Sequence, residues 1–211
     1  IDTSSSPFEA TGPNGAVINY TATATDAVDG NRPVSCTPMS GTTVPIGHAI
    51  LTCSSQDIRG NDTAELRQIT VSDAVGPLLV VPDDLTIEAT GPGGAAVDFA
   101  APTATDVVSG ALPVICNATS GSTFSLGRTT VTCNATDAAN NTTTKTFDVT
   151  VQDTTAPAVT APVDLDVEAP TGADALVTFD ATVTDAVTSG LTAACSPASG
   201  TRFALGTTSV T

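Results

Sequence analysis

Polar and apolar residues alternate along most of this 211-residue chain, in stretches rich in Val, Thr and Ile. Alternation puts successive side chains on opposite faces, and the Gly, Pro and Asn residues between the stretches are typical of turns, so the pattern predicts short β-strands. In the middle of the chain we expect strands at 78–81, 85–89, 95–105, 114–116, 122–124 and 129–136, and a last one that ends near residue 151. About seven short strands in ~80 residues favour a two-sheet sandwich of the immunoglobulin type.

One block of sequence occurs three times. It runs from Cys36 to Cys53, again from Cys116 to Cys133, and begins once more at Cys195. Acidic residues keep the same interval of about 80 positions: Glu9, Glu88 and Glu168, and Asp26, Asp106 and Asp185. The chain is therefore expected to be a tandem array of modules at 1–73, 74–153 and 154–211, extended and semi-rigid because the linkers are short and contain proline. The first module is expected to lack most of its first strand and the last to stop before its final strands, which would leave sheet edges open.

Apolar positions recur at matching places in the copies and predict the core. They are Tyr20, Phe99 and Phe179; Val44, Phe124 and Phe203; and Ile46, Leu126 and Leu205. An aromatic row can also bind ligands, but aromatic residues make up only 3% of this chain and these lie within strands, which favours packing. Pro102, in a stretch with one extra residue, predicts a bulge or an edge position.

The cysteines predict two disulfides, Cys36–Cys53 and Cys116–Cys133, because both pairs have the same spacing of 17. A bridge that closes about 18 residues is worth roughly 3 kcal/mol in the chain-entropy model and indicates an oxidising compartment. Buried free thiols are the alternative. Zinc is less favoured, since the chain has no CxxC motif and His48 is its one histidine. Cys195 is left without a partner.

Composition narrows the possible functions. A net charge of −16 and a pI near 4.1 argue against a nucleic-acid partner, which needs clustered Lys and Arg. Charged residues are only 13%, and Thr, Ser and Asn provide most of the polar surface, which suits a chain that carries sugar or packs into an assembly. No apolar run is long enough to span a membrane.

Several motifs of the chain occur together in one known family. They are DTTAP at 153–157, EATGP at 88–92, ATD-V at 104–107, LPVIC at 112–116, SGSTFSLGRTTVTC at 120–133 and ATDAANN at 135–141. With these motifs the chain resembles the hyalin-repeat (HYR) family. The resemblance implies an immunoglobulin-like fold, tandem modules, an extracellular location and a role in adhesion or surface structure, with no catalytic residues. The chain departs from the family in three places: Asn140 replaces a common glycine, 168–172 rearranges the EATGP turn, and Arg67 stands where the middle copy has Phe147. We therefore expect the last strand of the first module to be shifted or partly exposed.

Six Asn-x-Ser/Thr sequons are candidates for N-linked sugar: Asn19, Asn61, Asn117, Asn134, Asn140 and Asn141. Strand alternation is expected to point Asn19, Asn117 and Asn134 outward, and turns to expose Asn61 and Asn141. A chain rich in Thr and Asn also forms sequons by chance. Outward threonines such as Thr21, Thr23 and Thr25 are weaker candidates for O-linked sugar.

Aspartates at the module junctions, Asp73 and Asp153, are weak candidates for structural calcium, because a neighbouring module could add further oxygen ligands. The competing interpretation is that these and the turn aspartates (Asp26, Asp29, Asp57, Asp106, Asp137 and Asp185) are solvated and bond to their own backbone. No contiguous calcium-loop motif is present. Catalysis has little support, because there is no second histidine for a triad, no GxSxG motif and no phosphate-binding glycine loop.

The sequence thus predicts a structural or adhesive segment of a longer extracellular or cell-surface protein, which forms a rod or fibre and is not an enzyme. Its expected partners are neighbouring modules or copies of the same protein, through strand donation, and covalent glycans. The alternative is a carbohydrate- or protein-binding accessory module of a secreted or surface protein.

Overall fold

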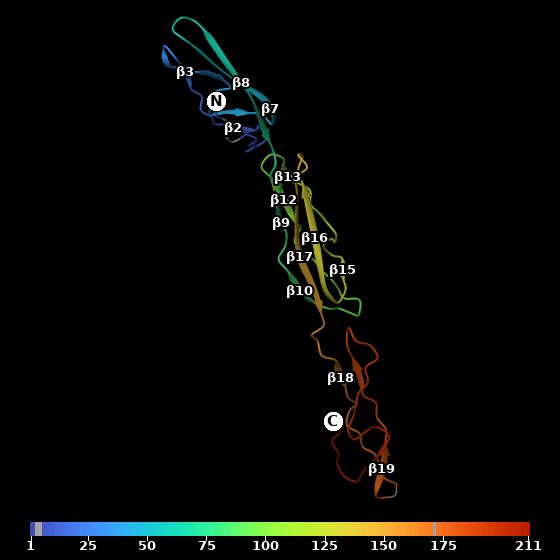
Figure 1. Ribbon diagram of the computed structural model, residues 1–211. Helices are drawn as coiled ribbons and strands as arrows, with labels where there is room; N and C mark the ends of the chain where they lie inside the picture. The colour runs from blue at the N-terminus through green and yellow to red at the C-terminus, as the bar shows by residue number, and fades with distance from the viewer. Residues whose placement is uncertain (3–5, 171) are drawn as a thin grey trace. The chain divides into compact units, whose positions relative to one another are not determined.

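The computed structural model describes residues 1–2, 6–170 and 172–211. All regular structure in these residues is β-strand, arranged in several sheets, which confirms the all-β prediction (Figure 1). In this described part, no helix is long and apolar enough to cross a membrane.

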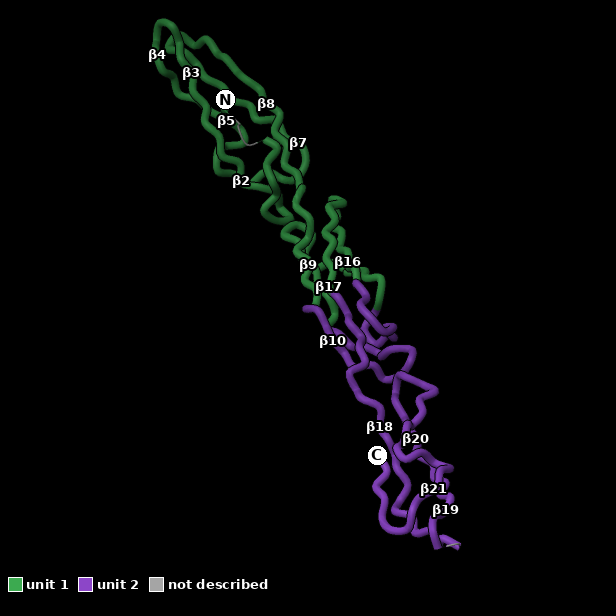
Figure 2. Tube along the Cα trace, turned by 60° about the horizontal axis from the view of Figure 1, so that its bottom comes forward, with its two compact units in different colours: residues 1–82, 100–118, 131–147 green, residues 83–99, 119–130, 148–211 purple. Residues whose placement is uncertain are grey.

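The chain divides into two compact units (Figure 2). The first comprises residues 1–82, 100–118 and 131–147, and the second comprises residues 83–99, 119–130 and 148–211.

The first unit is built on a long antiparallel hairpin, β7 (Gly47–Gln56) and β8 (Asp62–Ser72), which pair from Gly47↔Val71 to Gln56↔Asp62. The short strand β5 (Ser35–Thr37) adds to β7, and β1 (Phe8–Glu9) adds to β8 in parallel, so the sheet order is β1-β8-β7-β5. The other strands of this unit form small sheets: β2 (Ala16–Ile18) with β6 (Thr42–Val44); β3 (Ala24–Asp26) with β4 (Gly30–Arg32); and β12 (Thr103–Asp106) between β9 (Leu78–Val80) and β13 (Gly110–Leu112).

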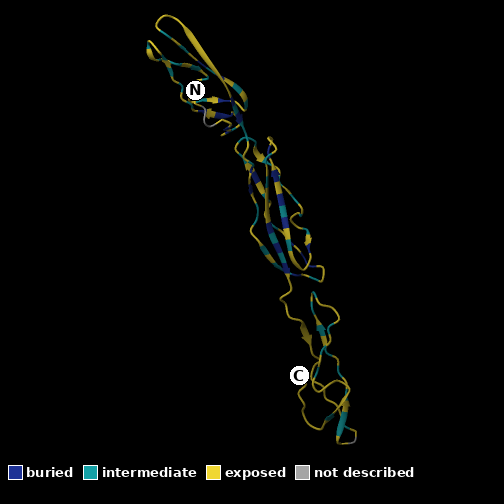
Figure 3. Ribbon diagram, in the orientation of Figure 1, coloured by how far each residue is buried: buried dark blue, intermediate teal, exposed yellow. Residues whose placement is uncertain are grey.

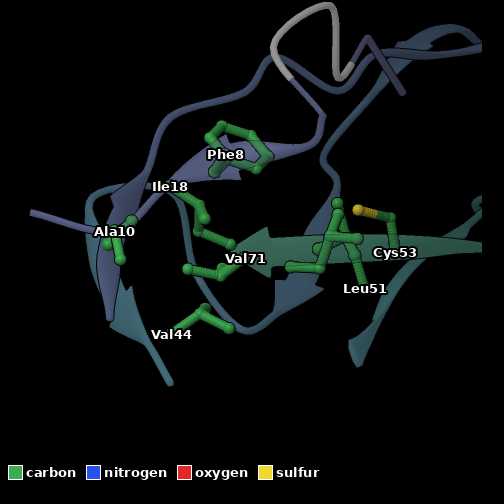
Figure 4. Packing of buried hydrophobic residues seen from close by; sticks show 9 residues of the cluster. Phe8, Ala10, Ile18, Val44, Leu51, Cys53 and Val71 are labelled. Carbon is green, nitrogen blue, oxygen red and sulfur yellow. The ribbon is translucent and has the colours of Figure 1, made fainter. Parts of the chain in front are cut away.

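The core near the amino terminus follows the alternation of the strands. Phe8, Ile18, Leu51 and Val71 converge in it (Figure 4), and Leu51 and Ile18 are fully buried. Ile50, the neighbour of Leu51 on β7, is 54% exposed, as alternation requires. The part of β8 before Ile69 is exposed along its length and includes Arg67, so the expected exposure of this strand is confirmed.

The middle of the chain holds the strand β17 (Thr142–Gln152) between β10 (Leu85–Glu88) and β16 (Gly127–Thr136), and β14 (Ile115–Cys116) pairs with β16. Within the second unit β10 is parallel to β17, from Leu85↔Val149 to Glu88↔Gln152. The same unit contains the pairs β11 (Ala95–Ala96) with β15 (Thr123–Phe124), β18 (Ala158–Thr160) with β20 (Thr182–Thr184), and β19 (Asp174–Val177) with β21 (Thr201–Ala204). No described hydrophobic side chain after Val151 is buried (Figure 3).

Two strand predictions need correction. The strand expected at 95–105 is two strands, β11 and β12, separated by a non-strand segment that contains Pro102. Proline donates no ladder hydrogen bond, which is consistent with a break there. The strand β13 was not expected, since its sequence Gly-Ala-Leu has no alternating run.

Three expected core residues are exposed. Phe124 and Val44 are buried as predicted, and Phe99 packs edge-on against Phe124 with ring centroids 6.5 Å apart. The prediction that Ile46, Leu126 and Leu205 are buried is wrong, because they are 45%, 43% and 65% exposed. Each precedes a glycine of positive φ (121°, 101° and 116°), so the chain turns at this point and strand alternation does not extend across it.

Candidate functional site

The structure forms both disulfides that the spacing predicts. Cys36 lies directly opposite Cys53 on β5 and β7, and Cys116 lies directly opposite Cys133 on β14 and β16, with 4.0 Å between the Cα atoms in each pair. Cys53 and Cys133 are buried. The half-buried Cys195 is a free thiol.

Three aspartates of the first unit come together in space. Asp73 follows β8, Asp106 ends β12, and Asp137 follows β16. One carboxylate oxygen from each lies within 4.8 Å of the other two. Asp73, the calcium candidate expected at the first junction, is therefore joined by two aspartates that lie in turns.

Local hydrogen bonds fix two of these carboxylates. Oδ1 of Asp106 accepts the backbone N–H groups of Val108 and Ser109 at 2.8 and 2.7 Å, which closes the turn between β12 and β13. These bonds hold the pKa of Asp106 below its ordinary value. Oδ1 of Asp137 accepts the backbone N–H of Asn141, and its Oδ2 accepts the Asn141 side-chain amide, each at 2.8 Å. The interpretation of Asp137 as a solvated turn residue is wrong, since it is only 6% exposed.

The third carboxylate is less well satisfied. Oδ2 of Asp73 is buried and accepts no hydrogen bond, while the Asp73 carbonyl oxygen accepts the amide of Asn141 at 3.0 Å. Burial, helped by the negative charges of Asp106 and Asp137, raises the pKa of Asp73. The ion pairs of the described residues involve Arg67, Arg128, Arg202 and the terminal amine, and none involves these aspartates. The other weak calcium candidate, Asp153, is exposed and belongs to no such cluster in the part of the chain described.

The first copy repeats the turns, but its described residues form no such cluster. Oδ1 of Asp26 accepts the N–H groups of Val28 and Asp29, as Asp106 does with its own neighbours. Asp57 accepts both the backbone and the side-chain N–H groups of Asn61, as Asp137 does from Asn141. These equivalent residues provide matched controls for the three-aspartate cluster.

Two glutamates, Glu9 and Glu88, accept hydrogen bonds from the segments that follow the first and second copies. The sequence did not predict this role. Both carboxylate oxygens of Glu9 lie within hydrogen-bonding distance of the Ala74 N–H, at 3.0 and 3.2 Å. Glu88 Oε1 accepts the N–H groups of Thr154 and Thr155 at 2.8 and 3.0 Å, and both hydroxyls also donate to this carboxylate. Bonds from Thr154 and Thr155 lower the pKa of Glu88 to about 2. The sequence feature that could have indicated this role is the regular interval between Glu9 and Glu88.

The sequons differ in how their amides are used. Asn19, Asn117 and Asn134 are exposed; Oδ1 of Asn117 accepts the N–H of Thr132, and Oδ1 of Asn134 accepts the Thr144 hydroxyl. Asn61 is exposed and donates from Nδ2 to Asp57, and Asn140 is exposed with a φ of 71°. The prediction that Asn141 is exposed is wrong, since it is partly buried and its Nδ2 donates to both Asp137 and Asp73.

His48 and the weaker sugar candidates lie at the surface. His48 is exposed, with its Nδ1 3.0 Å from the Thr70 hydroxyl. Thr21, Thr23 and Thr25 are also exposed. The second unit contains an apolar groove of about 1050 Å³, and residues such as Val159, Phe179 and Phe203 line it.

Comparisons with known proteins agree on one relationship. A family model described as the HYR domain matches residues 72–151. Hyalin from Lytechinus variegatus is 33% identical to the chain over 154 residues, which are 70% of this chain and 29% of hyalin. The chain therefore spans less than a third of the length of this relative.

Proposed function

Because residues 72–151 match the HYR domain and the chain is similar to hyalin, we propose that it is a member of the hyalin-repeat (HYR) family and a structural and adhesive segment of a longer extracellular or cell-surface protein, with no catalytic role. The two disulfides support the location, since such bonds persist in oxidising compartments. The mechanism we propose is mechanical: the segment carries tension along a rod or fibre.

The observation that carries this proposal is a parallel strand pair between the start and the end of a copy. The strand β10 is registered against β17 over four residues, and β1 is registered against β8 in the same way over two. Tension enters at the amino-terminal end of β10 and leaves at the carboxyl-terminal end of β17. In a parallel pair these ends are at opposite ends of the ladder, so the load shears all its hydrogen bonds together instead of opening them one by one.

The disulfide adds a second mechanical feature. Cys116 and Cys133 are 17 positions apart, and their bridge removes the intervening loop from the path of the force. An extended chain spans about 3.3–3.6 Å per residue. An oxidised copy should therefore lengthen on unfolding by roughly 55–60 Å less than a reduced one.

Single-molecule force spectroscopy on the full chain, held by its two ends, tests both features. Ala89 donates its N–H to the Gln152 carbonyl at 2.8 Å, so alternation directs the N–H of Ile87 toward β17 and that of Thr86 away from it. We expect Ile87→Pro to lower the unfolding force of the middle copy and Thr86→Pro to lower it much less. Reduction should lengthen the unfolding step.

Two results would count against the mechanical proposal. One is an unfolding force that Ile87→Pro and Thr86→Pro lower equally, since the ladder would then not resist the load. The other is an unfolding step of the same length in oxidised and reduced protein.

We also propose that the groove of the second unit takes a β-hairpin of the repeat's own type, supplied by a copy of the same protein. In the middle of the chain, β17 and β16 cover the edges of β10 and β14. The counterparts at 163–168 and 193–195 belong to no strand in the described structure. Residues 163–165, 167 and 193–195 line the groove together with Phe179 and Phe203. A peptide with the sequence of residues 127–152 and Cys133→Ser should bind the chain and protect amides of 163–168 from hydrogen exchange. Equal binding of a scrambled peptide would contradict the proposal.

The chain is proposed to carry N-linked sugar at its exposed sequons. Asn19, Asn61, Asn117, Asn134 and Asn140 are the candidates, because all five are exposed. Asn141 is not favoured, because a glycan on its Nδ2 would displace one of two hydrogen bonds. Intact mass before and after enzymatic deglycosylation, on protein from its natural source, tests this. A mass equal to that of the bare polypeptide would refute it.

A further inference from the structure

We infer that Asp73, Asp106 and Asp137 form a binding site for one calcium ion, which ties the end of β8 to the turns after β12 and β16. The inference does not depend on the proposed mechanical function, since it concerns three carboxylates within one compact unit.

The spacing of the carboxylates suits calcium. Calcium binds oxygen at about 2.3–2.6 Å, so two oxygens on opposite sides of one ion lie about 5 Å apart and adjacent ones lie closer. The three aspartate oxygens are all within 4.8 Å of one another. A single ion can therefore contact one oxygen from each residue, and water can fill the remaining positions of a six- to eight-fold shell.

An independent observation points to a missing ligand. Oδ2 of Asp73 is buried without a hydrogen-bond partner, although nearly all buried polar atoms in folded proteins have one. The cluster also includes Asp137, which is only 6% exposed. A buried carboxylate such as that of Asp137 needs a compensating positive charge, and the described ion pairs place no Lys or Arg against any of the three aspartates.

A proton on Asp73 is the competing way to relieve the repulsion. Burial and the neighbouring carboxylates already raise the pKa of Asp73, so this group takes up a proton more readily than an ordinary aspartate. A proton satisfies one carboxylate, whereas a divalent ion neutralises charge on all three. The two explanations differ in outcome, because a proton alone would leave no calcium binding to measure, whereas the proposed site takes up one ion.

The ligand types favour calcium over other metals. All three donors are hard carboxylate oxygens, with no histidine or cysteine in the cluster, which disfavours zinc and copper. Magnesium demands near-ideal octahedral geometry at 2.0–2.1 Å and dehydrates reluctantly, so three side chains fixed by their own turns suit it less well.

Isothermal titration of the full chain with calcium chloride, in 0.1 M KCl after treatment with chelator, tests the inference. We expect one ion per chain with a Kd on the order of 10⁻⁴ M. The variant Asp106→Asn should bind at least tenfold more weakly. Asparagine keeps an oxygen acceptor for the N–H groups of Val108 and Ser109, so the turn should survive.

The matched control is Asp26→Asn, which alters the same turn in the first copy, at an aspartate that is in no acidic cluster of the described residues. It should bind calcium as the unchanged chain does. As a second readout, calcium should raise the Tm of one calorimetric transition in the unchanged chain and in Asp26→Asn but not in Asp106→Asn.

Three results would overturn the inference. The first is no binding at 5 mM calcium, roughly fifty times the expected Kd. The second is equally weakened binding in Asp26→Asn and Asp106→Asn, which would indicate diffuse attraction of calcium to an acidic chain. The third is displacement of calcium by an equal concentration of magnesium.

Discussion

Removal of the Cys116–Cys133 bridge should lower the free energy of unfolding of the middle copy by about 3 kcal/mol. The two residues are register partners on β14 and β16, so the bridge closes an 18-residue loop without moving either strand. In the chain-entropy model a loop of this size contributes roughly 3 kcal/mol through the unfolded state. Since 1 kcal/mol shifts the Tm of a 60–100-residue domain by about 4–8 °C, the transition should fall by about 12–24 °C.

Differential scanning calorimetry can measure this shift with Cys116→Ala/Cys133→Ala in a Cys195→Ala background, where no thiol remains to exchange with the other bridge. The Cys195→Ala chain is the control, and Cys36→Ala/Cys53→Ala should lower a different transition. A fall of less than about 4 °C, equivalent to under about 1 kcal/mol, would refute loop closure as the source of stability.

Three further predictions concern single residues. Leu51→Ala should cost about 2–5 kcal/mol in chemical denaturation because Leu51 is fully buried, and Ile50→Ala, at a 54% exposed neighbour, should cost under about 1. Gly94→Ala should cost about 1–3 kcal/mol of stability, since a Cβ there would lie 1.8 Å from the Phe124 carbonyl oxygen and the residue has a φ of 100°. The control is Gly93→Ala, whose Cβ would meet nothing within 4 Å. Equal costs for the two variants would contradict the close approach. The Glu88 pKa of about 2, against an ordinary 4.5, means that its stabilising contribution is complete above about pH 4.5 and is lost as the pH falls toward 2. Glu88→Gln should therefore reduce the fall in the free energy of unfolding between pH 5 and 2, measured by urea unfolding. A pH dependence equal to that of the unchanged chain would contradict this.

Sequence patterns were sufficient to predict structure where strand alternation or residue spacing determines it. The buried positions Leu51, Cys53, Val131 and Cys133 agree with alternation on β7 and β16, because one face of a strand packs inward. Equal spacing of the cysteines identified the disulfides. The rule failed for Ile46 and Leu126, because the glycine after each has a positive φ and reverses the chain, and the sequence does not show which glycines do so.

The three-aspartate cluster could not be read from the sequence in full. Asp73, Asp106 and Asp137 are more than thirty positions apart from one another, and no contiguous motif joins them. The junction position of Asp73 indicated one candidate ligand, while solvation was the competing interpretation for all three aspartates. The burial of Asp137 depends on how the turns after β12 and β16 fold onto the end of β8, and this is a tertiary arrangement.

The acidic residues that mark the repeat serve its connections and turns more than its core. Glu9 and Glu88 hold the amides that follow Asp73 and Asp153, and Asp26, Asp106 and Asp185 each close a turn with two backbone N–H groups. A copy and the segment after it are therefore coupled by carboxylates.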